Sequence, residues 1–397
     1  MAMIPIQSKY PDRAGYLGLD TDRNVLSVMS DGKMKSTSIP EGWVNVKDFG
    51  AKGDGITDDT QAIQSAIDYA IVDRKPVYFP DGTYIVSSSI NIDIPSINNY
   101  KWFKIFSDGA KIKSASEFTG DQVMGIKKSF TQDETLIWID GLIFEGNHYI
   151  NGLDFLPDEP ANSLTHPTYN PYVQRINVSN CIFQNNYIGL RFSGNTLRVL
   201  NSVFRDNFMG TLLIDAANNN SFFGCSFRNN DGGVHLKSTS STRGTASNTF
   251  YGCIFEGNRG PAAILEDAVN TSFNACYFEY NCFNMNQFNW NYPKTLPNPC
   301  NIYMTAPLAL TNYGTSFNEC FSSAQPNPTF IYATSCYRLH ITPSCTGINV
   351  TFKGVFSDSY LYTKDIATPL TTASTTHIIY TFDGKYKHDG SGNWIPA

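Results

Sequence analysis

The chain repeats one pattern five times: Cys181-Ile182-Phe183-Gln184-Asn185-Asn186, Ser202-Val203-Phe204-Arg205-Asp206-Asn207, Cys225-Ser226-Phe227-Arg228-Asn229-Asn230, Cys253-Ile254-Phe255-Glu256-Gly257-Asn258 and Cys276-Tyr277-Phe278-Glu279-Tyr280-Asn281. Each copy has a small residue, Phe two positions later, and Asn three positions after the Phe. Successive Phe residues are 21, 23, 28 and 23 positions apart. A weaker copy, with Leu142 in the small position, runs from Ile143 to Asn147. A period of roughly 20–50 residues indicates a stack of structural units.

The residues between these marks favour strands over helices. They are short, punctuated by Asn and Gly, and leave no room for a helix and a return strand in every repeat. The leucine spacing and helical side of a leucine-rich repeat are missing. The pattern therefore predicts an all-β fold, a parallel β-helix in which each repeat is one coil and like residues stack about 4.8 Å apart. The Phe and Cys residues then form internal columns, and the Asn column binds the backbone of the turns.

The stretch from Trp43 to Ile67 predicts a short strand, a Gly-rich turn and a helix. Thr57 or Asp58 can cap the first free amides of that helix, and the acidic pair Asp58-Asp59 suits its positive end. An apolar stripe at helical spacing follows, formed by Ile63, Ala66, Ile67, Ala70 and Ile71. Two strands, Val77-Tyr78-Phe79 and Thr83-Tyr84-Ile85-Val86, flank the turn Pro80-Asp81-Gly82.

The residues from Val46 to Ile67 and from Val77 to Tyr84 resemble the entry segment of the pectate-lyase-like β-helix superfamily. That superfamily includes pectinases and the tailspike depolymerases of bacteriophages. The resemblance covers the entry motif closely and residues 42–355 as an architecture. It implies a right-handed β-helix whose open end is covered by the helix, and association of three chains.

Three segments are expected. Residues 1–41 form an N-terminal arm that attaches the protein to other phage tail proteins, with a strand at Asn24–Met29 and a turn at Asp31-Gly32. Residues 42–355 form the β-helix, and residues 356–397 form a small C-terminal β module. The resemblance implies that this module joins the chains of a homotrimer.

Composition excludes several classes of function. The net charge of −6 and the 16% of charged residues give no basic surface for nucleic acid. No apolar run approaches the roughly 18 residues of a membrane span, and the first residues lack the pattern of a secretory signal. The nine cysteines form no CxxC pair and have no His at zinc spacing, and no acidic cluster has calcium spacing. We therefore expect no metal, no cofactor and no disulfide framework.

The motifs of pectin hydrolases are missing. Polygalacturonases of the superfamily carry Asn-Thr-Asp, paired Asp, Gly-His-Gly and Arg-Ile-Lys on successive coils. Here Asn195-Thr196-Leu197 lacks the Asp, Gly-His-Gly does not occur, and Arg175-Ile176-Asn177 precedes instead of following. The tailspike branch fits better, which implies a protein made in the cytoplasm of a host bacterium and carried in the virion tail.

Carboxylates in outer columns are candidates for glycosidic cleavage, because most glycosidases use two of them. The eighth residue after each column Asn is Gly194, Asp215, Ser238 and Glu266. Asp215 and Glu266 are thus expected on outward turns two coils apart, about 9–10 Å, which is at the top of the inverting window of roughly 6.5–9.5 Å. Asp267, next in sequence, can raise the pKa of Glu266. The alternative is that these are solvated loop carboxylates.

A second carboxylate pair lies one residue after the repeated Phe. Glu256 and Glu279 are expected about 5 Å apart, the separation of retaining enzymes. Arg228 precedes them in the same column, so a structural ion pair with Glu256 is the stronger interpretation.

Other residues are candidates for binding the substrate. His235 and Lys237 share one face, with Arg191 two coils earlier, and they could serve a lyase as base and cations. Two long insertions, 148–173 and 282–315, are rich in aromatic residues that suit sugar rings, Trp290 and Tyr292 among them. Packing against a neighbouring subunit is the alternative for these loops.

The sequence therefore predicts a homotrimeric phage tailspike that binds and depolymerises a bacterial surface polysaccharide, capsule or O-antigen, by glycosidic hydrolysis. The alternatives are a non-catalytic receptor-binding spike and a polysaccharide lyase.

Overall fold

The computed structural model describes residues 42–94, 102–128, 136–156, 173–215, 217–239, 244–283, 300–305 and 314–323. Beyond these ranges it describes only short segments, which are 3–6, 15–20, 25–30, 33–36, 329–333, 336–337, 339–342, 344–345, 350–352, 356–357, 360–363, 378–381, 384–388 and 394–396.

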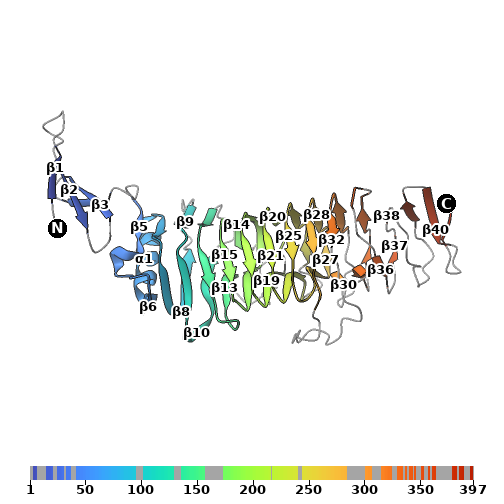
Figure 1. Cartoon of the computed structure of the whole chain (residues 1–397), viewed down its shortest axis with the longest axis horizontal. Coiled ribbons are helices and arrows are strands. Elements are labelled where there is room, and N and C mark those ends of the chain that lie inside the picture. The colour runs from blue at the N-terminus through green and yellow to red at the C-terminus, as the bar shows by residue number, and fades with distance from the viewer. Residues whose placement is uncertain are drawn as a thin grey trace, which may run out of the picture.

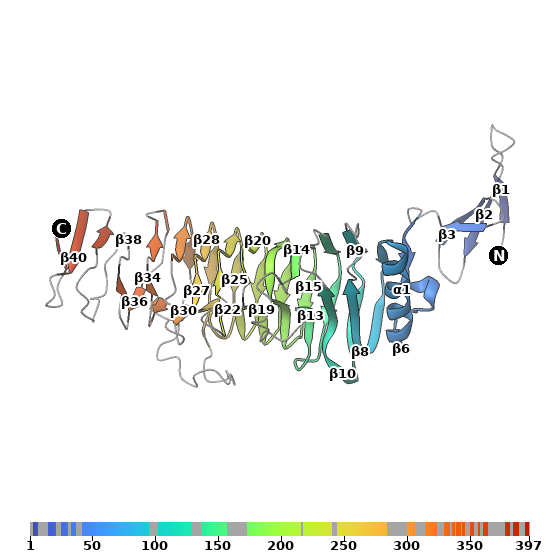
Figure 2. The same cartoon turned by 180° about the vertical axis from the view of Figure 1, so that it is seen from behind.

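The central chain winds into a right-handed parallel β-helix, as predicted. One coil passes through three sheets in turn: β11 in sheet 3, β12 in sheet 1, β13 in sheet 2, and then β14 in sheet 3 again. Figures 1 and 2 show the coils stacked along one long axis.

Each sheet collects one strand from each coil, paired in parallel with the next. Sheet 1 contains β12 (Ile143–Glu145), β15 (Ile182–Gln184), β18 (Val203–Arg205), β21 (Ser226–Arg228), β25 (Ile254–Glu256), β29 (Tyr277–Glu279) and β32 (Phe321–Ser323). Sheet 2 contains β13 (Asn151–Leu156), β16 (Ile188–Phe192), β19 (Met209–Ile214), β22 (Gly232–Lys237), β26 (Ala263–Glu266), β30 (Cys300–Thr305), β33 (Thr329–Ala333) and β36 (Val350–Phe352). Sheet 3 contains β5 (Val44–Asn45), β7 (Val77–Phe79), β9 (Trp102–Ser107), β11 (Leu136–Asp140), β14 (Val173–Ser179), β17 (Gly194–Leu200), β20 (Ser221–Phe223), β24 (Thr249–Tyr251), β28 (Ser272–Asn274), β31 (Ser316–Asn318), β35 (His340–Ile341), β38 (Tyr360–Thr363) and β39 (Ile378–Thr381).

The remaining strands join these sheets or pair beside them. The long strands β8 (Thr83–Ile94) and β10 (Lys111–Lys128) run along sheets 1 and 2, and β6 (Asp54–Asp58) pairs with β8. Two short parallel pairs lie beside the main sheets: β23 (Thr245–Ala246) with β27 (Ala268–Val269), and β34 (Cys336–Tyr337) with β37 (Phe356–Ser357).

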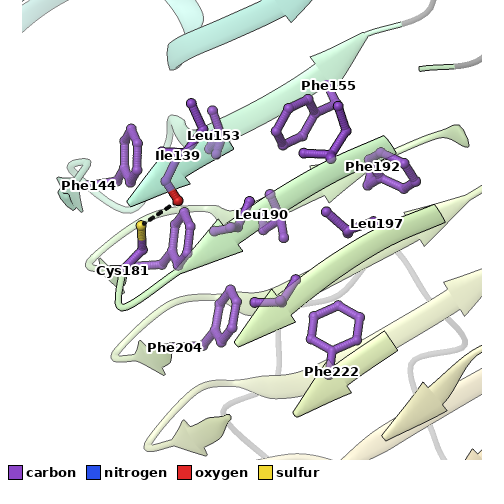
Figure 3. Packing of buried hydrophobic residues seen from close by; sticks show 14 of the residues in the cluster. Ile139, Phe144, Leu153, Phe155, Cys181, Leu190, Phe192, Leu197, Phe204 and Phe222 are labelled. Carbon is purple, nitrogen blue, oxygen red and sulfur yellow. Dashed lines mark hydrogen bonds between the residues drawn. The ribbon is translucent and has the colours of Figure 1, made fainter. Parts of the chain in front are cut away.

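The predicted Phe column is confirmed. The rings of Phe144, Phe183, Phe204, Phe227, Phe255 and Phe278 stack nearly parallel, with centroids 4.7–5.2 Å apart. A second column of Phe222, Phe250, Phe273 and Phe317 has spacings of 4.9–5.0 Å. Figure 3 shows Phe144 and Phe204 of the first column and Phe222 of the second among the buried hydrophobic residues. Stacked aromatic rings add attraction beyond the area that they bury, so the two columns tie each coil to the next.

The cysteines behave as small core residues, as expected. Cys225, Cys253 and Cys276 are at most 1% exposed, and each thiol donates to a carbonyl of the preceding coil at 3.4–3.5 Å. Burial raises the pKa of the Cys181 thiol to about 12. Eight cysteines whose side chains are described are all free thiols.

The Asn column is confirmed from Asn186 onward. Asn186, Asn207, Asn230, Asn258 and Asn281 are completely buried, and each of the first four side-chain amides donates to the side-chain oxygen of the next Asn at 2.7–3.1 Å. The same oxygens accept backbone N–H groups of the preceding coil. Asn147 is not a member, because its side chain accepts from the backbone of Tyr149 in a local turn. Asn220 and Asn248 form a second buried ladder, which the repeat pattern did not reveal.

Helix α1 (Thr60–Asp73) covers the N-terminal end of the β-helix (Figure 1). Its buried residues are the five predicted from the apolar stripe. Asp58 accepts from the amide of Thr60, as expected for a cap. Asp59 was expected to bind the helix amides, and this expectation is wrong. Its buried carboxylate instead accepts from the backbone amides of Lys52 and Gly53 in the preceding turn. A short 3₁₀ helix (Val46–Phe49) leads into that turn.

Antiparallel strands lie at both ends of the chain. β1 (Met3–Ile6), β2 (Gly15–Asp20), β3 (Val25–Ser30) and β4 (Lys33–Ser36) form a meander, which includes the predicted strand. Parallel pairing continues past residue 355 through β38 and β39, and β40 (Gly384–His388) and β41 (Trp394–Pro396) then pair antiparallel. The change of pairing thus comes later in the chain than the expected boundary, and the division into three segments stays a prediction.

The Asn column generates a test of stability. Replacement of Asn230 by Ala removes four hydrogen bonds of one side chain: the buried backbone N–H of Asn207 loses its acceptor, and Phe204 O and Asn258 Oδ1 each lose a donor. We expect a loss of about 2–5 kcal/mol in the free energy of unfolding, measured by denaturant titration. Asn229→Gly is the control, because Asn229 is exposed and its φ of 55° suits Gly. A loss from Asn230→Ala no larger than that of the control would contradict this role.

Candidate functional site

Charged side chains lie buried on the outer face of sheet 2. Along each strand alternate residues face the core, so Asp154, His235 and Glu266 point outward. Their exposed fractions are nevertheless 0%, 3% and 6%. Burying charged groups costs free energy unless they are paired, and such groups gather at functional sites. We therefore take this face as the candidate site.

Two outward columns carry these groups. The first runs through Asp154, Arg191, Leu212, His235, Ile264 and Tyr303, one residue from each successive coil. The second runs through Ile214, Lys237, Glu266 and Thr305. His235 and Lys237 therefore share one face with Arg191 two coils earlier, and that predicted arrangement is confirmed.

His235, Lys237 and Glu266 form the centre of the site. Glu266 Oε2 lies 3.1 Å from His235 Nε2, and Glu266 Oε1 lies 3.9 Å from Lys237 Nζ. Burial lowers the pKa of His235, although Glu266 acts in the opposite direction. The imidazole is therefore neutral at neutral pH, and it is oriented by the carboxylate of Glu266.

The predicted alignment of Asp215 with Glu266 is wrong by one residue. Asp215 aligns with Ser238 and Asp267, whereas Glu266 stacks on Lys237. The reason is turn length: Val234 comes four positions after Asn230, but its partner Ala263 comes five positions after Asn258. Because the turn at 259–262 has one extra residue, equal counts from the column Asn no longer mark equivalent positions in β22 and β26. Glu266 is also not on a solvated turn, because it ends β26 and is buried.

Asp215 and Glu266 nevertheless contact the same coil, the one that carries His235, Lys237 and Thr239. Asp215 follows β19 with a φ of 38°, and its carboxylate accepts from the backbone amide and the hydroxyl of Thr239 at 2.6 and 2.5 Å. Thr239 lies on the coil of His235 and Lys237, toward which Glu266 leans from the other side. We call Asp215, His235, Lys237 and Glu266 the outer charged cluster.

Asp267 and the second predicted pair lie elsewhere. Asp267 has a φ of 50° and is fully buried in the turn after β26. Glu256 and Glu279 are neighbours in sheet 1, as predicted. The expected ion pair is present as well, with 3.2 Å between Arg228 Nε and Glu256 Oε2, and Tyr277 donates to Glu279. These contacts favour a structural role for the second pair.

The structure also reveals a buried partner of Arg191 that sequence reasoning missed, Asp154. Asp154 accepts from Arg191 at 2.6 Å and from Asn151 at 3.1 Å. Burial raises the pKa of Asp154 to about 6, and the charge of Arg191 opposes that rise. Asp154 precedes the regular repeat and follows the weaker copy, so no column pointed to it. The only available signal was the alternation of apolar and polar residues in Asn151–Leu156, which places Asp154 between the core residues Leu153 and Phe155.

Tyr303 lies in the insertion 282–315, whose aromatic residues were expected to suit sugar rings. It follows Ile264 in the first column, and its ring stacks on Tyr332 with centroids 5.9 Å apart. Burial raises its pKa, so the phenol stays protonated at neutral pH. The predicted sugar-binding residues Trp290 and Tyr292 lie outside the described residues.

Neither a metal centre nor a membrane helix is found in the described part of the chain. No group of three or more His, Cys, Asp or Glu side chains there could hold an ion. No helix among those residues is long and apolar enough to cross a membrane.

Comparison with solved structures supports the fold. ORF18 of Geobacillus virus E2 is 20% identical, with a TM-score of 0.51, over 86% of this chain and 69% of that one. The tailspike protein gp49 of Pseudomonas phage LKA1 is 13% identical, with a TM-score of 0.51, over 81% of this chain and 71% of that one. At these identities the likeness concerns the fold alone.

Curated relatives match short stretches. The pre-neck appendage protein of Bacillus phage phi29 is 28% identical over 147 residues, which are 35% of this chain and 16% of that protein. Alginate lyase 7 of Azotobacter vinelandii is 66% identical over 44 residues, which are 11% of this chain and 5% of that protein. The chain thus spans only a small part of the length of the curated relatives that it matches.

The family comparison covers more than half of the chain. Residues 43–254 match the family described as rhamnogalacturonase A/epimerase, pectate lyase-like. The matched range begins at the predicted entry motif and includes α1 and the coils up to β25. With its stacked parallel coils and its buried Phe and Asn columns, this chain belongs to the rhamnogalacturonase A/epimerase, pectate lyase-like family.

Proposed function

We propose that this protein is a phage spike that binds and cleaves a bacterial surface polysaccharide, capsule or O-antigen, by hydrolysis of glycosidic bonds. The observation that carries the proposal is the outer charged cluster, in which two carboxylates flank one coil that bears a cation and a neutral imidazole. The description of the family, which names a rhamnogalacturonase and a pectate lyase-like fold, supports a polysaccharide as the substrate.

The geometry suits an acid and base pair. Asp215 and Glu266 belong to coils that are two strand spacings apart, about 9–10 Å. Asp215 leans toward the coil between them through Thr239, and Glu266 leans toward it through His235. The carboxylates are therefore expected closer together than their backbones, within the window of roughly 6.5–9.5 Å that leaves room for a water in an inverting hydrolase.

Neighbouring side chains hold the carboxylates of Asp215 and Glu266 in place. Thr239 binds both oxygens of Asp215, and His235 binds one oxygen of Glu266. Lys237 lies between the two carboxylates along the axis and can bind an anionic or hydroxyl group of the sugar. In hydrolysis one carboxyl protonates the leaving oxygen while the other takes a proton from the attacking water.

Asp154 and Arg191 extend the same face toward the N-terminus. Arg191 lies two coils before His235, so a long polysaccharide along the axis would meet both groups. Asp154 Oδ1 and Arg191 Nε are buried and have no hydrogen-bond partner among the described residues. The Arg191 side chain is 32% exposed, so its guanidinium can bind hydroxyl or anionic groups of the sugar while the buried Asp154 holds it in place.

A lyase is the second candidate, favoured by one observation. His235 is neutral and shares its face with Lys237, Arg191 and, one coil after Ile264, the protonated phenol of Tyr303. These are the base, cations and acid that β-elimination at a uronic acid requires. Cleavage would then depend on His235 and would leave a new C=C bond in the product.

The phage context comes from the relatives. The similar pre-neck appendage protein and the neighbouring tailspike fold both belong to phages. We propose that the protein is made in the cytoplasm of a host bacterium and assembles into the virion tail through residues 1–41. A spike that binds the polysaccharide without cleaving it is the remaining alternative.

Incubation with a panel of capsular and O-antigen polysaccharides tests the proposal. We expect one of them to release new reducing ends without gaining the ultraviolet absorbance of an unsaturated uronate. Asp215→Asn and Glu266→Gln should each lower the rate of cleavage by about 10²–10⁴-fold, while the affinity for the polysaccharide stays within a few-fold of the parent. Glu256→Gln is the matched control, because that carboxylate pairs with Arg228 in sheet 1.

Three outcomes would count against this mechanism. Absorbing products, together with loss of cleavage in His235→Gln and not in Asp215→Asn, would indicate a lyase. Loss of cleavage only in the sheet 1 variants would move the site to Glu256 and Glu279. Binding without cleavage of any polysaccharide would indicate a spike that only attaches.

The raised pKa of Asp154 predicts a dependence of stability on pH. In the folded protein Asp154 keeps its proton up to about pH 6, whereas the ordinary pKa is 3.8. Its contribution to stability is therefore complete below that ordinary value and is lost as the pH rises through 6. Relative to Asp154→Asn, the parent should lose on the order of 3 kcal/mol of unfolding free energy between pH 4 and 7. Denaturant titrations of both proteins measure this difference, and parallel pH curves would refute it.

The trimer is tested by mass. Each chain has a mass of 44.1 kDa, so we expect light scattering to give about three times that value at micromolar concentration. A mass close to that of one chain would exclude a stable trimer.

A further inference from the structure

The outer face of sheet 3 carries an aromatic and cationic strip far from the outer charged cluster. Trp102 and Trp138 point outward from β9 and β11 and are 48% and 37% exposed. Lys104 lies beside Trp138 in the same column, followed by Asn177 and Arg198. We call Trp102, Lys104, Trp138 and Arg198 the aromatic strip. In Figure 1, β9 and β14 lie along one edge of the solenoid, opposite β13 and β19.

The indole of Trp138 is held in place. Its Nε1 donates to Ser179 Oγ at 2.9 Å, and Ser179 Oγ donates to Asp140 Oδ1 at 2.5 Å. Lys104 Nζ lies 4.5 Å from the centroid of the Trp138 ring. An exposed ring that is fixed by hydrogen bonds loses little conformational entropy when a ligand packs on it.

The charges of the strip have one sign. Within the part of the chain that the structure describes, neither Lys104 nor Arg198 forms an ion pair. The carboxylate of Asp140, which lies beside Ser179 in the neighbouring column, accepts hydrogen bonds from Ser179 and Asn180. A cationic strip on a chain with a net charge of −6 indicates a local preference for an anionic ligand.

The strip has the shape of a site for an extended chain. Lys104, Trp138, Asn177 and Arg198 occupy four successive coils, so the row extends about 14 Å along the axis. Exposed indoles can pack against the C–H faces of sugars with the ring surface that Lys104 leaves open, Asn177 can bind hydroxyls, and the two cations can bind carboxylates. A small ligand would use only part of this row.

We propose that the aromatic strip is a second, non-catalytic binding site for an anionic polysaccharide. The inference rests on the proposed function, because it assigns the same class of ligand to a second face of the molecule. Two faces that bind one polymer raise the effective affinity, since the second contact is made at high local concentration.

Binding to immobilised polysaccharides tests the strip. The probes are a panel of acidic and neutral capsular polysaccharides, and every protein carries Glu266→Gln so that cleavage does not erode the surface. Trp138→Ala and Arg198→Ala should each weaken binding to an acidic member about tenfold, and Trp138→Phe should recover part of the loss. Tyr251→Ala is the matched control, because Tyr251 is 52% exposed on the same face of sheet 3 and lies beyond the strip. Added salt should weaken the parent more than Arg198→Ala.

Cleavage of short oligosaccharides separates this inference from the proposed function. With Glu266 intact, Trp138→Ala and Arg198→Ala should cleave short oligosaccharides at the rate of the parent. Unchanged binding in both variants would overturn the second site and leave the cleavage site untouched. A fall in mass to one chain in Trp138→Ala and Trp138→Phe would also overturn it, by assigning the strip to an interface between subunits. Parent protein that neither binds nor cleaves any polysaccharide would reject the proposed function itself.

Discussion

The spacing between coils is the constraint on which the rest of the structure depends. Phe rings stack 4.7–5.2 Å apart and buried Asn side chains bind one another at 2.7–3.1 Å, and both require successive coils to repeat their backbone in register. A buried amide donates to the next coil and accepts from the preceding one, so a displaced coil would leave polar groups unpaired on both sides. The aromatic columns are fully buried, and the hydrogen bonds of the Asn column set the register.

This constraint explains why the interior could be predicted from the sequence. A Phe that faces the core must follow its small residue by two positions in every coil, because β15, β18, β21, β25 and β29 all have the same length. Five apolar positions of α1 were likewise predicted from helical spacing alone. Buried residues repeat because the available space repeats, and that regularity is visible in one sequence.

The outer face could be predicted only in part. His235, Lys237 and Arg191 were placed together correctly, because alternation within a short strand is a local property. The alignment of Asp215 with Glu266 failed, because it assumed equal turns and the turn at 259–262 has one more residue. Asp154 was missed because distant parts of the chain bury it, and no local sequence pattern reports burial on an outward face. That burial is also what raises its pKa.

The extra residue after Asn258 has a consequence for how this architecture can change. The Phe and Asn columns pass through that coil without interruption, with ring spacings of 4.9 and 5.0 Å on either side. The turn at 259–262 therefore absorbs the inserted residue, and β26 keeps its inward and outward residues in register with those of β22. Turns that lie outside the two columns can therefore gain or lose a residue, and so reshape the surface beside the strands, without displacing the strands themselves.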